Sequence, residues 1–388
     1  MKKTAALILL CTLLLSLFPP AFAENEYVLY AASVGKADAL LLKVNEYCFL
    51  IDTGYAASRG KILYGMELLG MDHLDGVFVT HTDGDHIGGL EWLAESGIPI
   101  ENWYASALYT GVKNEDKHPV SKAAALRDAS VTWLKAGDRF QLGDAELQVL
   151  APGKQFNDTD NNNSLVMMLR TPLGNILLCG DMEYEEEAWL LKNCDALDCD
   201  VLKVANHADD DTGSIEFILA ASPSLSVIST STAEKPETPD AALVKRLMRN
   251  GSSIVQTQET NGGVMGTLTA EGPRAEYISL PACDTDVYIS SVDSQEQSFI
   301  ITNGGDAPAD LSDWYLLTWK KECCLAFPRG TVLQPGESLR VAGRQTGGNV
   351  DVVWAEKKPV NPKKADGLSL YDRWGRLVSQ LDNGIDED

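Results

Sequence analysis

The stretch VTHTDGDHIGG, residues 79–89, carries the pattern from which both the fold and the chemistry of the chain can be inferred. Within six residues it holds two histidines and two aspartates: His81, Asp83, Asp85 and His86. The apolar run GVFV at 76–79 predicts a buried strand, and IGGLEW at 87–92 predicts the start of a helix. Loops at the carboxyl ends of strands present ligand-binding groups in α/β proteins. Imidazole nitrogens beside carboxylate oxygens suit zinc, manganese or iron, so the stretch predicts a divalent-metal site.

Three other apolar runs also end in a residue that can bind a metal. CFLID ends at Asp52, NILLCGD ends at Asp181 and DVLKVANH ends at His207. Taken singly, Asp181 could be the N-cap of the following helix, and His207 could be a surface residue. Taken together, the strand ends predict one shared site.

Strand-like and helix-like segments alternate over residues 24–280. Apolar and β-branched runs predict strands at 27–33, 39–44, 48–52, 76–80 and 175–181. Periodic runs predict helices at 61–70, 88–97 and 241–251. This mixture indicates a layered α/β domain. From residue 284 to 382, short alternating runs separated by Gly, Pro, Asn and Asp predict an all-β sandwich of about seven strands.

The chain opens with MKKTAALILLCTLLLSLFPPAFA, which has two lysines, an apolar run and a small-residue motif. This pattern predicts a signal peptide at 1–23, cleaved after about Ala23, and therefore a secreted protein. A membrane anchor is the alternative, but the run is short and is broken at Pro19 and Pro20. No other stretch approaches the roughly 20 apolar residues of a membrane span, so we expect none in the mature chain.

The chain is strongly acidic, with a formal net charge of −24 over 388 residues. Such a field repels polyanions and argues against an extended nucleic-acid-binding surface.

Five motifs, in order, resemble the metallo-β-lactamase fold: LIDTG, THTDGDHIGGL, NNNSLVMML, LLCGDME and DVLKVANH. More narrowly, they resemble the hydrolase domain of ComEC-type competence proteins and its free-standing secreted relatives. The segment VGKAD at 34–38 is similar to one that usually reads V-G-Q-G-D in that subfamily. The resemblance covers most of residues 27–270. It implies an αββα sandwich with one or two divalent metal ions in the cleft between its sheets, and the set of imidazole and carboxylate ligands favours zinc or manganese.

The resemblance implies six metal ligands, namely His81, Asp83, Asp85, His86, Asp181 and His207. His81 and Asp83 would bind one ion, and Asp85 and His86 would bind the other. Asp181 would bridge the two ions, and His207 would complete the second. Asp52 would brace the site by hydrogen bonding. Asp85 would also orient the attacking water, which makes it the catalytic candidate.

Two departures from the superfamily pattern concern asparagines. Where a histidine is common about twenty residues before the bridging aspartate, this chain has NNNS at 161–164. Asn162 and Ser164 are therefore candidates either to hydrogen-bond the metal ligands or to bind substrate. Where relatives tend to read H-H-G-S, the chain has Asn206 before His207. Asn206 could hydrogen-bond substrate. Asp83 also departs from the general motif, but it is the form usual in ComEC-like proteins.

The resemblance implies a phosphodiesterase or nuclease-type hydrolase that uses a metal-activated hydroxide. The charge favours a small phosphodiester, or DNA that is engaged weakly. Two alternatives stay open: a catalytically inactive binding module, and a hydrolase of a non-phosphate substrate such as a lactam or another ester.

The C-terminal part carries a second resemblance, through DLSDWYL, LQPGESL and LYDRWGRLV. These motifs are similar to the lamin-tail domain, an immunoglobulin-like sandwich, over residues 284–382. Bacterial examples accompany secreted hydrolases, which implies contact with cell wall or nucleic acid. Lys357, Lys358, Lys363 and Lys364 are either an anion-binding patch or a solvated loop.

Overall fold

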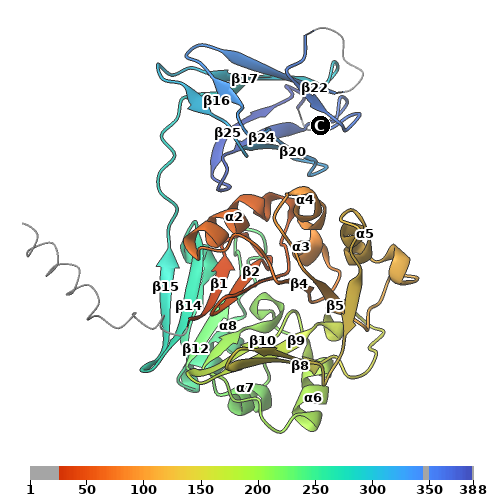
Figure 1. Cartoon of the computed structure of the whole chain (residues 1–388), viewed down its shortest axis with the longest axis vertical. Coiled ribbons are helices and arrows are strands. Elements are labelled where there is room, and N and C mark those ends of the chain that lie inside the picture. Colours follow the sequence, from red (N-terminus) through yellow and green to blue (C-terminus); the bar gives the residue numbers. More distant parts are fainter. Residues whose placement is uncertain (1–25, 344–348, 387–388) are drawn as a thin grey trace, which may run out of the picture.

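The computed structural model describes residues 26–343 and 349–386. In its N-terminal part, two β-sheets lie face to face (Figure 1). In spatial order, the first sheet contains β15 (Gly272–Ile278), β14 (Gly263–Thr269), β1 (Tyr27–Ala32), β2 (Leu40–Val44), β3 (Tyr47–Ile51), β4 (Gly76–Val79), β5 (Trp103–Ser106) and β6 (Val131–Leu134). The second contains β13 (Ser253–Gln256), β12 (Leu225–Ile228), β11 (Val201–Lys203), β10 (Gly174–Leu178), β9 (Val166–Thr171), β8 (Ala145–Ala151) and β7 (Arg139–Leu142).

Helices cover the outer face of each sheet. The first sheet packs against α2 (Arg59–Leu68), α4 (Leu90–Glu95) and α5 (Pro119–Ala125). The second packs against α6 (Tyr184–Asn193), α7 (Ile215–Ala221) and α8 (Ala241–Arg249). Shorter helical turns lie in the connections: η1 (Ala56–Ser58), α3 (Gly84–Ile87), η2 (Glu115–Lys117), η3 (Asn161–Asn163), η4 (Ala205–Ala208) and η5 (Thr257–Glu259).

Strand β1 shows why its sequence is apolar at every position. Tyr27, Leu29 and Ala31 belong to the core between the two sheets. Val28 and Tyr30 face the other way, into the core beneath the helices. A strand that is covered on both faces has no solvent side for polar residues to occupy. The predicted αββα sandwich is therefore confirmed.

Parallel pairing directs the ends of the central strands toward the same place. β3 pairs in parallel with β4 in the first sheet, and β10 pairs in parallel with β11 in the second. Parallel strands end at the same edge of a sheet, so the loops that follow these four strands gather at one end of the sandwich.

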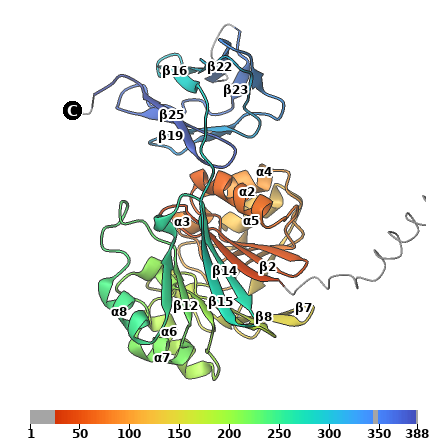
Figure 2. The same cartoon turned by 90° about the vertical axis from the view of Figure 1, so that its left-hand side faces the viewer.

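The C-terminal part is a second, all-β sandwich (Figure 2). One sheet contains β16 (Val287–Asp293), β17 (Ser298–Asn303), β22 (Ser338–Gly343) and β23 (Val352–Trp354). The other contains β20 (Cys324–Ala326), β19 (Tyr315–Thr318), β24 (Gly367–Tyr371) and β25 (Leu377–Asp382), and a separate pair is formed by β18 (Ala309–Asp310) and β21 (Val332–Leu333). The sequence predicted about seven strands, whereas the described residues form ten. Four of them are only two or three residues long, which is too short for an alternating pattern to mark.

The two parts meet where the C-terminal sandwich rests on α2 and α4 (Figures 1 and 2). The hydroxyl of Tyr315 donates to the carbonyl of Ala57 at 2.9 Å. The buried guanidinium of Arg59 lies 4.7 Å from the centroid of the Tyr315 ring and 5.4 Å from that of Trp92. This cation–π contact joins the C-terminal sandwich to the first turn of α2.

Within residues 26–343 and 349–386, no helix combines the length and the apolar composition needed to cross a bilayer. The predicted signal peptide, residues 1–23, lies outside the described residues.

Helix α6 buries a carboxyl group, and this yields a test of the fold. Glu186 is fully buried, and neither of its carboxyl oxygens makes a hydrogen bond of good geometry. Burial raises the pKa of Glu186 well above its ordinary value of 4.5, and contact with the Ser164 backbone offsets only part of this effect. The folded state therefore retains a proton that the unfolded state releases above pH 4.5, and stability falls as the pH rises, by up to about 1.4 kcal/mol per pH unit.

We expect Glu186→Gln to raise the thermal unfolding midpoint at pH 8 by more than at pH 5, because the amide carries no charge to desolvate. The exposed neighbour Glu185 provides the control, as Glu185→Gln should leave the midpoint unchanged at both pH values. An equal shift for Glu186→Gln at pH 5 and pH 8 would contradict this reading of the buried carboxyl.

Candidate metal centre

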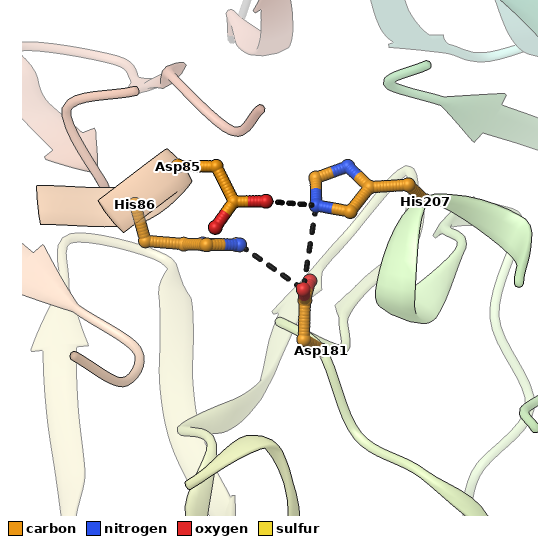
Figure 3. Close-up of side chains that lie close together, drawn as sticks. All are labelled: Asp85, His86, Asp181 and His207. Carbon is orange, nitrogen blue, oxygen red and sulfur yellow. Dashed lines mark ion pairs between the residues drawn. The ribbon is translucent and has the colours of Figure 1, made fainter. Parts of the chain in front are cut away.

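Four side chains from three loops converge between the two sheets (Figure 3). Asp85 and His86 come from α3, which begins one residue after Asp83 in the loop that follows β4. Asp181 lies three residues beyond the end of β10, and His207 lies in η4, after β11. The strand ends of both sheets therefore contribute to one cluster, which we call the quartet: Asp85, His86, Asp181 and His207.

The quartet is compact. One potential ligand atom from each of the four side chains lies within 4.8 Å of the others. Oδ2 of Asp181 is 3.1 Å from Nε2 of His86 and 3.3 Å from Nε2 of His207. Oδ2 of Asp85 is 3.4 Å from the same nitrogen of His207. Asp181 is therefore the central group of the quartet.

The other two predicted ligands lie beside the quartet. Nε2 of His81 is 3.9 Å from Oδ2 of Asp181 and 3.8 Å from Oδ2 of Asp83. The imidazole of His81 is buried, whereas the side chain of Asp83 is 53 % exposed. All six candidates thus lie at one centre, with Asp83 on its solvent side.

Hydrogen bonds direct Nε2 of each histidine toward the centre. Nδ1 of His86 donates to Oδ2 of Asp52 at 2.8 Å, and Nδ1 of His207 donates to the carbonyl of Ser229 at 2.9 Å. The hydroxyl of Thr80 donates to Asp52, so it accepts from Nδ1 of His81 at 3.0 Å. With the proton on Nδ1, the lone pair of each ring is on Nε2, as a metal ligand requires.

The centre leaves buried polar atoms without a hydrogen-bond partner. Among the described residues, these include Nε2 of His81, His86 and His207 and Oδ1 of Asp181. Buried polar atoms are costly unless something satisfies them. Three imidazole nitrogens and converging carboxylate oxygens fit one or two divalent metal ions, which would satisfy these atoms.

Electrostatics couples the charged groups of the centre. Burial alone would raise the pKa of Asp181, but His207 and His86 outweigh it and hold that pKa well below its ordinary range. For His86 burial acts to lower the pKa, and the carboxylates of Asp181 and Asp52 raise it well above the usual value. The cluster is therefore built around ionised carboxylates.

The backbone that carries these groups is unusual. Asn206, His207 and Ala208 are three consecutive residues with positive φ, at 44°, 52° and 63°. Asp52 also has a positive φ, of 59°. Such conformations cost about 1–3 kcal/mol each outside glycine and concentrate at functional sites. The turn that presents His207 is therefore held in place by its surroundings against its local preference.

Of the four polar residues proposed from the sequence to support the ligands or bind substrate, two contact the ligands and two do not. Asp52 is in the centre, bonded to His86, and the hydroxyl of Ser164 accepts from the backbone N–H of Asp181 at 3.1 Å. Nδ2 of Asn162 instead donates to Glu183 at 2.9 Å, and Nδ2 of Asn206 donates to Asp211 at 2.9 Å. The structure thus brings Asp52 and Ser164 to the ligands and ties the two amides to neighbouring acids.

Residues that the sequence analysis did not single out also reach the centre. Nζ of Lys36 is 3.3 Å from Oδ2 of Asp85. Lys203 and Asp38 form a buried ion pair with 2.7 Å between Nζ and Oδ2, and Asp38 also lies close to Asp52 and His86. Lys36 and Asp38 lie in the segment VGKAD, whose similarity to V-G-Q-G-D could have indicated from the sequence that both residues belong to the centre.

An αββα sandwich with such a cluster between its sheets defines a class of metal-binding proteins. The family model described as the metallo-beta-lactamase superfamily matches residues 32–231, more than half of the chain. The chain therefore belongs to the metallo-β-lactamase superfamily, whose fold binds divalent metals. The family model of the lamin tail domain matches residues 282–384, so the C-terminal sandwich is a lamin tail domain.

Similarity to individual proteins is more distant. ComE operon protein 3 of Bacillus subtilis (strain 168) is 24% identical over 272 residues, which cover 66% of this chain and 34% of that protein. Competence protein ComA of Neisseria gonorrhoeae is 26% identical over 264 residues, which cover 67% of this chain and 35% of that protein. The chain thus spans about a third of the length of these relatives. The crystal structure of the metallo-β-lactamase fold protein YhfI from Bacillus subtilis, at 11% identity and a TM-score of 0.38, covers 60% of this chain and 96% of YhfI.

The bond from His86 to Asp52 gives a test of the centre. We expect Asp52→Asn to weaken zinc binding about 10–100-fold, because the carboxylate no longer orients the ring or raises its basicity. Competition with a chromophoric chelator measures the affinity. Asp195→Asn, at an exposed position, is the matched control. An unchanged affinity in a folded Asp52→Asn protein would contradict this role.

Proposed function

We propose that the protein is an exported, metal-dependent phosphodiesterase. The observation that carries the proposal is the set of buried imidazole nitrogens around Asp181 that lack a hydrogen-bond partner. The quartet would hold one divalent ion, zinc or manganese, and His81 and Asp83 would share Asp181 with a second. An ion bound there supplies a Lewis acid and lowers the pKa of a coordinated water toward about 7.

Asp85 is proposed as the catalytic carboxylate. Its side chain is 17% exposed, compared with 3% for Asp181, so it can reach a water that enters from solvent. Burial raises its pKa, but the neighbouring imidazoles of His207 and His86 outweigh this and keep the pKa below the ordinary range. Asp85 therefore stays ionised and can orient a water.

The other residues position these groups. Asp52 fixes the ring of His86, and Ser164 holds the backbone at Asp181. Asn162 fastens η3 to the start of α6, because it also accepts from the backbone N–H of Glu186 at 3.1 Å. Asn162 is therefore proposed to stabilise the loop around η3 and not to bind substrate. Asn206 would act in the same way through Asp211.

A phosphodiester substrate is implied by the resemblance to ComEC-type hydrolase domains, and similarity to ComE operon protein 3 and to competence protein ComA supports that resemblance. Charge limits the size of that substrate. The chain has 56 acidic and 32 basic residues, and tight binding of a polynucleotide normally depends on many Lys and Arg contacts to phosphate. A small phosphodiester, or DNA that is held weakly, is favoured on this ground.

Export is proposed from the N-terminal sequence alone, with cleavage after about Ala23. The lamin tail domain is proposed to contact cell wall or nucleic acid. Its support is a set of four exposed lysines in an otherwise acidic protein: Lys357, Lys358, Lys363 and Lys364.

Hydrolysis of bis(p-nitrophenyl) phosphate tests the proposal. We expect activity that depends on added Zn²⁺ or Mn²⁺ and that falls at least about 100-fold in Asp85→Asn and in His86→Ala, since each removes a group from the quartet. Asp195→Asn should retain wild-type activity. Cleavage of a β-lactam such as nitrocefin without diester cleavage would contradict the proposal, and metal binding without turnover of any substrate would indicate a binding module.

A further inference from the structure

A polar pocket of about 330 Å³ is lined by segments of the chain that also contact the metal centre. Its lining contains four hydroxyl side chains and one amide, from Ser33, Thr230, Ser231, Thr232 and Gln258, and no aromatic ring. Pockets for small molecules span about 300–1,000 Å³, so this one is at the small end of the range. It fits a compact polar group and offers no surface on which a base could stack.

Two segments of the chain form walls of both the pocket and the centre. Thr230 directly follows Ser229, whose carbonyl accepts from Nδ1 of His207. Gly35 lines the pocket and directly precedes Lys36, whose Nζ lies 3.3 Å from Oδ2 of Asp85. The pocket and the centre therefore share these two segments of the chain.

The backbone of Lys36 is fixed from both sides. Its N–H donates to Oε2 of Glu234 at 3.0 Å, and its carbonyl accepts from the hydroxyl of Tyr55 at 3.0 Å. The side chain is 19% exposed, so the ammonium remains reachable from solvent. By contrast, Lys203 is fully buried against Asp38. Lys36 thus presents a positive charge at the junction of the centre and the pocket.

The acid at the rim limits which groups can enter. Glu234 is exposed and lies against Gly35, so close that a Cβ at Gly35 would be 2.2 Å from Oε1 of Glu234. A carboxylate there accepts hydrogen bonds from hydroxyl groups and repels a second phosphate. The pocket therefore suits an uncharged substituent that carries hydroxyl groups.

We propose that Lys36 and this pocket select the substrate, binding a small phosphodiester in which one substituent is a sugar. Lys36 would contact a non-bridging oxygen of the phosphate, and the hydroxyl-lined pocket would take the sugar. This inference rests on the proposed function and narrows it to sugar-phosphate diesters of low molecular weight. In the similar V-G-Q-G-D segment, glutamine stands at the position of Lys36. Lys36→Gln therefore removes the ammonium charge and leaves a residue that the segment commonly carries.

Kinetics on two diesters test the inference. We expect Lys36→Gln to raise the KM for both bis(p-nitrophenyl) phosphate and p-nitrophenyl thymidine 5′-phosphate about tenfold, because a charge-assisted hydrogen bond to the substrate is lost. Lys122→Gln makes the same charge change at an exposed position on α5 and should leave KM unchanged.

A second variant addresses the pocket. Thr232 is exposed, and its backbone N–H donates to Gln258 at 2.9 Å, a bond that a substitution of the side chain preserves. We expect Thr232→Leu to raise KM several-fold for the thymidine diester only, because the new side chain narrows the pocket and removes a hydroxyl. An equal effect on both diesters would overturn the assignment of the pocket to the sugar.

Calorimetric binding of thymidine 5′-monophosphate to the metal-loaded protein separates this inference from the proposed function. If the wild type cleaves diesters but Lys36→Gln retains its KM and its affinity for the monophosphate, the inference fails and the function stands. If the wild type cleaves no diester but Lys36→Gln binds the monophosphate about tenfold more weakly, the recognition site stands and the function fails.

Discussion

The carboxylate of Asp181 is the group on which the rest of the centre depends. It is 3% exposed and lies within 4 Å of Nε2 of three histidines, which come from both sheets. A buried carboxylate is tolerated only when positive or hydrogen-bonding groups surround it. The two sheets must therefore close on each other at the ends of β4, β10 and β11, and the core between them fixes how closely they do so.

Much of this arrangement could be predicted because its signals are local. The strand before His81, the strand before Asp181 and the helix over 241–249 each carry their own periodicity or apolar run. Strand ends of parallel pairs meet by topology, so an aspartate or histidine at each of several ends predicted a shared site. The motif around Asp85 then indicated the metal chemistry.

Other features depend on contacts that no local pattern reveals. The amide of Asn162 is used by Glu183, which lies 21 residues away in sequence, and Lys203 is paired with Asp38 across the molecule. The left-handed backbone at Asn206 and His207 goes against local preference, so it follows only from the packed structure. The proximity of Lys36 to Asp85 is likewise a product of how β1 and α3 are brought together.

The lamin tail domain adds a constraint on the same end of the molecule. Its Tyr315 bonds to Ala57, five residues beyond Asp52, and Arg59 fills the contact between the two sandwiches. The loop that carries Asp52 is thus held at one end by the metal centre and at the other by the C-terminal sandwich. Access to the centre remains on the side of Asp83, Asp85 and Lys36, where side chains are partly exposed.

We expect the quartet around Asp181 to hold a divalent ion. Crystals grown with Zn²⁺ and measured at the zinc absorption edge test it directly. We expect an anomalous peak enclosed by Asp85, His86, Asp181 and His207, which disappears in His207→Ala. An ordered centre with no anomalous density among these four side chains would contradict it.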